Sequence, residues 1–365
     1  MTQGNMDTAV FQRTKYFPSL DGLRALSVFL VMFNHVHAPV PSWIYGPLGV
    51  DVFFVLSGFL ITTLMLREKE RTGEVSLRGF YTRRFFRIIP VYVFTVLLYF
   101  VAVHAAHDSM KAQQLNVALP WLLTFFQEYR PAAAGNILGH AWTLGIEEKF
   151  YIVWPLLLIA LYPFRTRALL CLAVIFISIL LFPHVYARSY DGLLIGAVLA
   201  IALSAPGRTA VAKALGRIPD GVLFLLVAGT YALHGYSNKF VLFFSGAIAL
   251  LVASLVLRHG LLRRLLEAPA LVFIGKRSYA MYLIHVLVLN FVEKLQPAFL
   301  AHNGVLIVFV AFGLTLAGAS VMYVAIERPC IALGRRLSRG ERRGISEPVR
   351  DAEPVRDTEP VRDTG

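Results

Sequence analysis

Residues 49–62 read GVDVFFVLSGFLIT, an apolar run in which Asp51 is the only charged residue. With its apolar flanks, the run approaches the roughly twenty residues that a helix needs to cross a bilayer. Similar runs recur along the chain, at about residues 19–38, 48–66, 88–106, 142–163, 168–183, 190–205, 221–236, 240–258, 270–293 and 304–327. The sequence therefore predicts an all-α polytopic membrane protein with about ten transmembrane helices.

The composition and the order of charges support this prediction. Of 365 residues, 57% are hydrophobic and only 16% are charged, and the mean hydropathy is +0.64; soluble domains carry about a quarter of charged residues. The net charge of +13 could suggest nucleic acid, but Lys and Arg concentrate in alternate links between the runs. This alternation predicts cytoplasmic termini, an inner-membrane location in contact with the lipid bilayer, and no nucleic-acid partner.

The chain divides into three expected parts. Residues 1–14 are a short cytoplasmic segment, residues 15–335 are the membrane domain, and residues 336–365 are a basic and then repetitive tail. The tail repeats Glu-Pro-Val-Arg-Asp three times, a composition that predicts disorder. No cleavable signal peptide is expected. The two cysteines lack the spacing of a metal site, so no metal is expected.

The first span contains a candidate base. It reads RALSVFLVMFNH from Arg24 to His35, and on one continuous helix these two side chains share a face, about 16 Å apart along the axis. An imidazole in the outer part of the span can accept a hydroxyl proton, although a structural histidine explains it equally well. Asp51 begins the second span at a similar depth and could orient the imidazole.

Further ionisable residues follow in the third and fourth spans. Arg84 and Arg87 share a helix face at the inner surface, where they could grip phosphates or simply anchor the helix. In the fourth span Glu147 shares a face with Thr143, whereas Glu148 points about 100° away and needs a different partner. The arginines lie toward the inner surface of the membrane, where they suit an anionic donor. The histidine and the carboxylates lie toward the outer surface, where they suit a polar acceptor.

These motifs, in this order, resemble the acyltransferase-3 family of membrane acyltransferases over about residues 15–335. The resemblance rests on Arg24 and His35, GVDVFFVLSGFLIT, RRFFR at 83–87, WTLGIEEKFY at 142–151, RSYDGLLIGAVLA at 188–200, SYAMYLIH at 278–285 and ERP at 327–329. It implies an O-acyltransferase with acyl-CoA, commonly acetyl-CoA, as co-substrate and no permanently bound cofactor. The acceptor would be a hydroxyl of a carbohydrate or glycosylated molecule, as in polysaccharide O-acetylation.

The resemblance also implies roles for individual residues. Arg24 and His35 match the family's essential pair, Arg84 and Arg87 its RxxR pair, and Thr143 to Glu147 its SxxxE motif with threonine in place of serine. We expect Arg84, Arg87 and Arg24 to bind the CoA phosphates, and His35 to act as general base or to form an acyl-histidine. Asp51 or Glu147 would position the imidazole, and Glu148 is a further catalytic candidate.

Two expectations concern other kinds of protein. Some relatives carry an additional SGNH-type domain; none is expected here, so the membrane domain would handle the acceptor itself. The main alternative function is a transporter whose histidines and carboxylates relay protons, which predicts inverted repeats or broken helices. A scaffolding role is a third possibility, but it leaves the outer ionisable residues unexplained.

Overall fold

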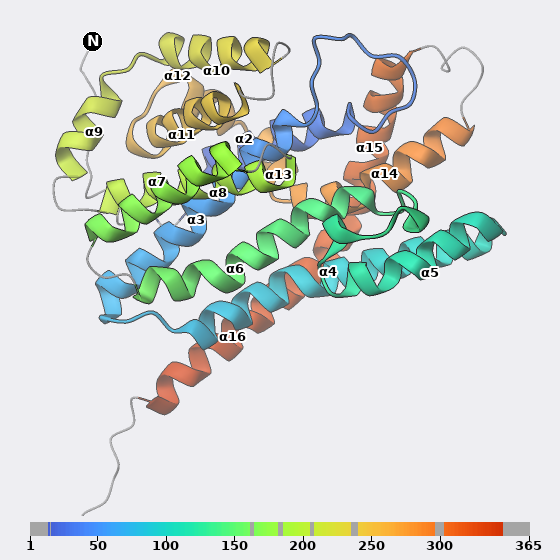
Figure 1. Ribbon diagram of the computed structural model, residues 1–365, viewed down its shortest axis with the longest axis horizontal. Helices are drawn as coiled ribbons and strands as arrows, with labels where there is room; N and C mark the ends of the chain where they lie inside the picture. The colour runs from blue at the N-terminus through green and yellow to red at the C-terminus, as the bar shows by residue number, and fades with distance from the viewer. Residues whose placement is uncertain are drawn as a thin grey trace, which may run out of the picture.

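The computed structural model describes residues 14, 16–160, 164–181, 185–204, 208–234, 240–295 and 303–345, and every regular element in these ranges is a helix (Figure 1). The first half holds α2 (Pro18–Met32), α3 (Leu48–Thr72), α4 (Leu77–Ala105), α5 (Ser109–Leu123), the short turns η1 (Gln127–Tyr129), η2 (Ala132–Ala134) and η3 (Gly139–Ala141), α6 (Trp142–Ala160) and α7 (Phe164–Leu181). The second half holds α8 (Val185–Ser204), α9 (Arg208–Gly216), α10 (Asp220–His234), α11 (Val241–Leu257), α12 (Leu261–Leu266), α13 (Pro269–Gly275), α14 (Ser278–Leu295), α15 (Gly304–Met322), the π-helical turn η5 (Tyr323–Glu327) and α16 (Arg328–Ile345).

The all-α prediction is confirmed for these residues, but the predicted number of spans is not. Among the described residues, three helices are long and apolar enough to cross a membrane, namely α3, α4 and the continuous helix Gly304–Ser338. A fourth span results if α13 and α14, bent by 73° at their junction, count as one. Several other predicted runs form shorter apolar helices, among them Asp220–Leu233 and Val241–Leu257.

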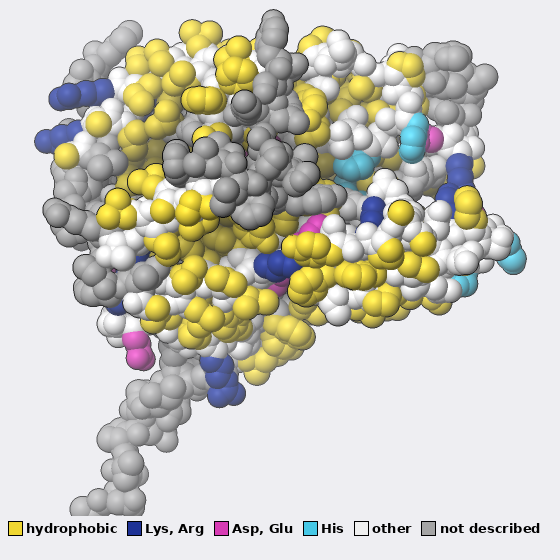
Figure 2. Space-filling model, in the orientation of Figure 1, with side chains coloured by type: hydrophobic (Ala, Val, Ile, Leu, Met, Phe, Trp, Pro, Cys, Tyr) yellow, Lys and Arg dark blue, Asp and Glu magenta, His cyan; other side chains and the backbone are white. Residues whose placement is uncertain are grey.

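Apolar side chains also cover broad areas of the molecular surface (Figure 2). Val101 on α4, Ile152 on α6 and Phe224 on α10 each expose more than half of their surface. Large exposed apolar areas are unfavourable in water and mark contact with a membrane or a partner. Together with the long apolar helices, they identify a membrane protein.

Two glycines allow α3 and α8 to pack backbone against backbone. A Cβ atom on Gly58 would lie 1.8 Å from the Leu193 carbonyl oxygen, and one on Gly196 would lie 2.1 Å from the Val55 carbonyl oxygen. Close contact therefore explains Gly58, although glycine weakens a helix interior. This packing holds the face of α3 that carries Ser57 in place.

The first helix is shorter than predicted. α2 ends at Met32, and His35 lies in the following turn, where its backbone N–H donates to the Met32 carbonyl oxygen over 3.2 Å. The prediction that Arg24 and His35 share a face of one continuous helix is therefore wrong. The chain at Gly46 packs closely against this turn, since a Cβ atom on Gly46 would lie 2.8 Å from the Asn34 backbone nitrogen and 2.9 Å from the Leu30 carbonyl oxygen.

α4 is longer than predicted, and α16 follows beyond the last predicted span, which ends at residue 327. Ser76 caps α4 by accepting a hydrogen bond from the Gly79 N–H over 3.1 Å, so the helix begins eleven residues before the predicted span at residue 88. α16 packs along α4 and continues to Ile345, which makes the start of the predicted tail helical. The chain between the runs 88–106 and 142–163 contains α5, which lies beside α4 (Figure 1). The repeats lie outside the described residues.

Candidate active site

A cavity of about 390 Å³ lies between α2, α3, α4, α6 and α14. This volume is in the range of small-molecule sites in proteins. The turn η5 and the first half of α16 complete its wall through Tyr323, Glu327 and Arg335. Helices far apart in the sequence therefore meet around one space that can hold a ligand.

Cationic side chains dominate the charge of this cavity. Among the described residues that line it, six are cationic and three are acidic: Arg24, Arg67, Arg84, Arg87, Lys276 and Arg335 against Asp21, Glu147 and Glu327. An excess of guanidinium groups in a confined space favours a ligand with several negative charges, and arginine forks match phosphate oxygens. The three predicted donor-binding arginines thus line one cavity.

Two of the arginines that line the cavity are held by neighbouring side chains. The Arg24 guanidinium donates to Asp21 over 3.1 Å, and Asp21 also accepts from the Tyr16 hydroxyl over 2.5 Å. Arg84 lies over the ring of Tyr151 on α6, with 5.4 Å between its Cζ atom and the ring centroid. Aromatic stacking of this kind orients a guanidinium while leaving its N–H groups available for an anion.

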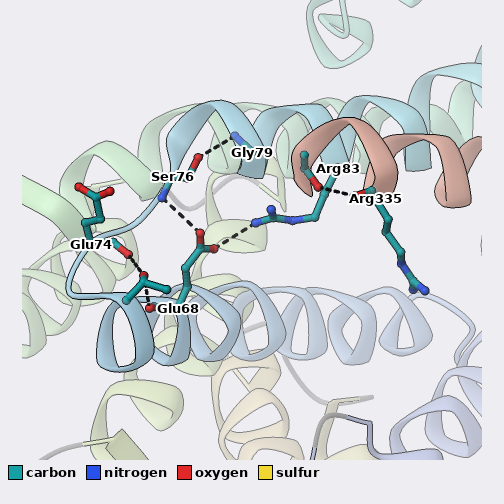
Figure 3. A network of polar contacts seen from close by, with 8 residues as sticks. Glu68, Glu74, Ser76, Gly79, Arg83 and Arg335 are labelled. Atoms are coloured by element: carbon teal, nitrogen blue, oxygen red, sulfur yellow. Dashed lines mark hydrogen bonds and ion pairs between the residues drawn. The ribbon is translucent and has the colours of Figure 1, made fainter. Parts of the chain in front are cut away.

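Arg83, the neighbour of Arg84, belongs to a different network (Figure 3). Its guanidinium donates over 3.1 Å to Glu68 near the end of α3, and Glu68 also accepts from the Ser76 N–H over 3.3 Å. This network joins α3 to α4 outside the cavity lining. The Arg335 side chain extends from α16 toward α3 and is not bonded to this network in Figure 3.

Glu147 lies in the cavity with its two carboxylate oxygens bonded. One accepts from the Ser57 hydroxyl over 2.7 Å, and the other accepts from the Tyr151 hydroxyl over 3.1 Å. Thr143, one turn earlier, also lines the cavity, and its hydroxyl lies 2.7 Å from the Tyr282 hydroxyl. The shared face predicted for Thr143 and Glu147 is confirmed.

Irregular backbone also lines the cavity. The break between α13 and α14 contributes Gly275, Lys276 and Ser278, and the π-helical turn contributes Tyr323 and Glu327. π-helical turns occur frequently at functional sites. Non-helical backbone at membrane depth is tolerated where it lines a cavity or is buried in protein. Both irregularities therefore agree with a functional role for this space.

Three histidines form a cluster just beyond Tyr282, which is part of the cavity wall. The ring centroids of His35 and His285 are 4.8 Å apart, those of His140 and His285 are also 4.8 Å apart, and those of His35 and His140 are 5.9 Å apart. The Tyr282 ring lies 5.5 Å from both His140 and His285. His285 is fully buried and His140 is nearly so, whereas His35 is half-buried. The described residues contain no cluster suited to a metal ion.

The structure separates the predicted partners of His35. Glu147 lies among the arginines, and Asp51 lies in the first turn of α3, near Asp191 rather than bonded to the imidazole. His285 occupies the place we had expected for one of these carboxylates, with its Nε2 atom 3.2 Å from the Nδ1 atom of His35. Glu148 is outside the described cavity lining, as its different helical direction predicted.

Sequence reasoning missed His140, and it included His285 only as the last residue of the motif SYAMYLIH. His140 stands immediately before the motif WTLGIEEKFY, and its Nε2 atom lies 3.1 Å from the Leu283 carbonyl oxygen of α14. His140 and Leu283 are 143 positions apart in the sequence, so tertiary packing brings them together. His140 lies in η3, immediately before α6.

Comparison with known proteins agrees with the architecture of this site. The sequence pattern of the acyltransferase-3 family, described as "Acyltransferase domain", matches residues 17–324. The chain belongs to this family, so the predicted family and the predicted enzyme class, an acyltransferase, are confirmed. No solved structure matches the chain significantly.

Curated relatives from Staphylococcus aureus are similar to the chain over most of its length. "Putative O-acetyltransferase SACOL0978" of strain COL is 30% identical over 356 residues, which is 87% of this chain and 58% of the relative. "O-acetyltransferase OatA" of strain NCTC 8325 / PS 47 is 30% identical over 365 residues, 89% of this chain and 60% of the relative. The chain thus spans about three fifths of the length of the curated relatives it matches.

Proposed function

We propose that this chain is a membrane-bound O-acyltransferase that moves an acetyl group from acetyl-CoA to a hydroxyl of a carbohydrate or glycosylated acceptor. The observation that carries the proposal is the cavity between α2, α3, α4, α6 and α14, which presents Arg24, Arg84 and Arg87 to an anionic ligand and ends beside the histidine cluster. The names of the relatives support acetyl as the group and oxygen as the acceptor atom.

The donor would enter from the arginine side. The positive-inside rule puts this side in the cytoplasm of a cell bounded by an inner membrane. Arg84, Arg87, Arg24 and, nearer the mouth, Arg335 bind the phosphates of acetyl-CoA, and the thin pantetheine arm lies along the cavity toward Thr143 and Tyr282. Remote binding of the phosphates positions the thioester for reaction.

The reaction then needs one base and no bound cofactor. The Nε2 atom of His35 takes the proton of the acceptor hydroxyl as its oxygen attacks the thioester carbonyl carbon. The carbon–oxygen ester bond forms, the carbon–sulfur bond breaks, and the departing CoA thiolate receives the proton from the imidazolium. The hydrogen bond between Thr143 and Tyr282 lies next to this step and keeps both hydroxyls in a fixed place.

The test compares two histidines that are two residues apart. His37 is exposed and bonds through its Nδ1 atom to Glu293 over 2.7 Å, outside the cavity lining. Cells carrying wild type, His35→Gln or His37→Gln as the sole copy are analysed for acetate released from surface glycans by mild base. We expect loss of the acetyl esters with His35→Gln and normal levels with His37→Gln, at equal amounts of folded protein in the membrane. Full acetylation with His35→Gln would overturn the proposal.

A further inference from the structure

The bonds of the histidine cluster determine which ring nitrogens carry hydrogen. The Nδ1 atom of His35 lies 3.2 Å from the Val31 carbonyl oxygen, and that of His285 lies 2.5 Å from the Tyr282 carbonyl oxygen. A carbonyl oxygen can only accept a hydrogen bond, so both Nδ1 atoms bear hydrogen in the neutral rings. The Nε2 atoms of His35 and His285 therefore each keep a lone pair.

This assignment makes the contact between the two rings directional. His35 Nδ1–H is shared between the Val31 carbonyl oxygen and the Nε2 lone pair of His285, each 3.2 Å away. Val31 belongs to the same turn as His35, whereas His285 comes from α14 and is fully buried. His285 therefore ties the half-buried ring to another helix by a hydrogen bond, and its own tautomer is held by the carbonyl of Tyr282.

We propose that His285 is a positioning residue that directs the Nε2 atom of His35 toward the acceptor hydroxyl and accepts the Nδ1 hydrogen bond throughout the reaction. The inference rests on the proposed function of His35. When Nε2 takes the hydroxyl proton, the ring becomes positively charged, and the neutral His285 lone pair stabilises the Nδ1–H that now carries part of this charge. His285 occupies the place that a carboxylate takes in many base–carboxylate pairs.

Two amide substitutions separate this role from simple packing. Glutamine places its amide near the position of the imidazole Nε2 atom, so His285→Gln can still accept from His35. Asparagine places its amide near the Nδ1 position, so His285→Asn keeps the bond to the Tyr282 carbonyl oxygen but loses the acceptor. The two variants are alike in polarity, which makes them a matched pair for a buried site.

The experiment measures two quantities on the full chain. The first is the initial rate at which base-releasable acetate accumulates on surface glycans after induction, per folded protein in the membrane. The second is the Kd of acetyl-CoA for the purified protein in lipid nanodiscs. We expect His285→Asn to lower the rate about tenfold to a hundredfold, the range for groups that orient metal-bound histidines, with the Kd within twofold of wild type. His285→Gln should keep most of the wild-type rate.

The outcomes distinguish this inference from the proposed function. A wild-type rate with His285→Asn would overturn the positioning role, and so would an equal loss with His285→Gln and His285→Asn. If His35→Gln is inactive in the same assay, either of these results leaves the base role of His35 intact. If His35→Gln transfers acetate at the wild-type rate, the proposed function itself fails, whatever the two His285 variants do.

Discussion

Replacing Arg84 by glutamine should weaken the binding of acetyl-CoA much more than the same change at Arg83. The two arginines are adjacent on α4, so they share the helix, the depth in the membrane and the formal charge. Arg84 lines the cavity above the rings of Tyr151 and Phe80, whereas Arg83 pairs with Glu68 outside it. The comparison therefore isolates what the cavity-lining guanidinium does.

The expected size follows from the bonds that Arg84 can make. A hydrogen bond to a charged group contributes about 1.5–3 kcal/mol, so loss of one Arg84–phosphate contact should raise the Kd of acetyl-CoA about tenfold to a hundredfold. Arg84→Lys keeps the charge but not the planar fork, and should fall between wild type and Arg84→Gln. Arg83→Gln removes a partly exposed ion pair, worth at most about 1 kcal/mol of stability, and should leave the Kd unchanged.

The measurement is titration of purified protein in nanodiscs with acetyl-CoA, followed by calorimetry at low salt. Thermal unfolding of each variant confirms that the protein is intact before binding is compared. A Kd for Arg84→Gln within twofold of wild type would show that the cavity does not hold the donor phosphates through this residue. Equal weakening by Arg83→Gln and Arg84→Gln would show that only the general positive charge of α4 matters.

Three further predictions test other parts of the site. Raising the ionic strength should increase the Kd of acetyl-CoA in wild type and somewhat less steeply in Arg84→Gln, because this variant has lost one of the several guanidinium contacts that salt screens; titrations at two salt concentrations measure this. Glu147→Gln should lower the rate of glycan acetylation at least about tenfold and leave the Kd of the donor nearly unchanged. The Glu147 carboxylate accepts two hydroxyl hydrogen bonds in the cavity, and the amide of glutamine cannot accept both in the same way. Gly58→Ala should lower the midpoint of thermal unfolding, because the new Cβ atom must move about 1.6 Å to reach ordinary contact distance from the Leu193 carbonyl oxygen. Gly313→Ala should leave the midpoint unchanged, because a Cβ atom at Gly313 has open space around it.

Residues spaced along one helix were predictable from the sequence. Arg84 and Arg87 are three residues apart, and Thr143 and Glu147 are four apart, and in each case both side chains line the cavity. Helical periodicity fixes such relations locally, so no knowledge of other helices is required. The same reasoning correctly separated Glu148 from Glu147. The helical nature of each apolar run followed from composition for the same reason.

Relations between helices were not predictable. The contact between His35 and His285 joins residues 250 positions apart, and it depends on the end of α2 at Met32 and on the packing of α14 against α2. Similar depth in the membrane suggested that Asp51 and Glu147 would be partners of His35, but depth does not specify the direction in which a side chain points around the bundle. Glu147 consequently lies among the arginines, at the other side of Tyr282.

The break between α13 and α14 bears on the transporter alternative, which predicted broken helices. The structure does contain one, with a bend of 73°, so this feature alone does not separate a transporter from an enzyme. The packing of Gly275 against α2 explains the broken helix without a transport function. A Cβ atom on Gly275 would lie 1.9 Å from the carbonyl oxygen of Asp21, so the break brings the end of α13 directly onto the turn of α2 that holds Arg24. The broken helix therefore builds the arginine end of the cavity, where we propose that the donor binds, and membership of the acyltransferase-3 family favours that explanation over transport.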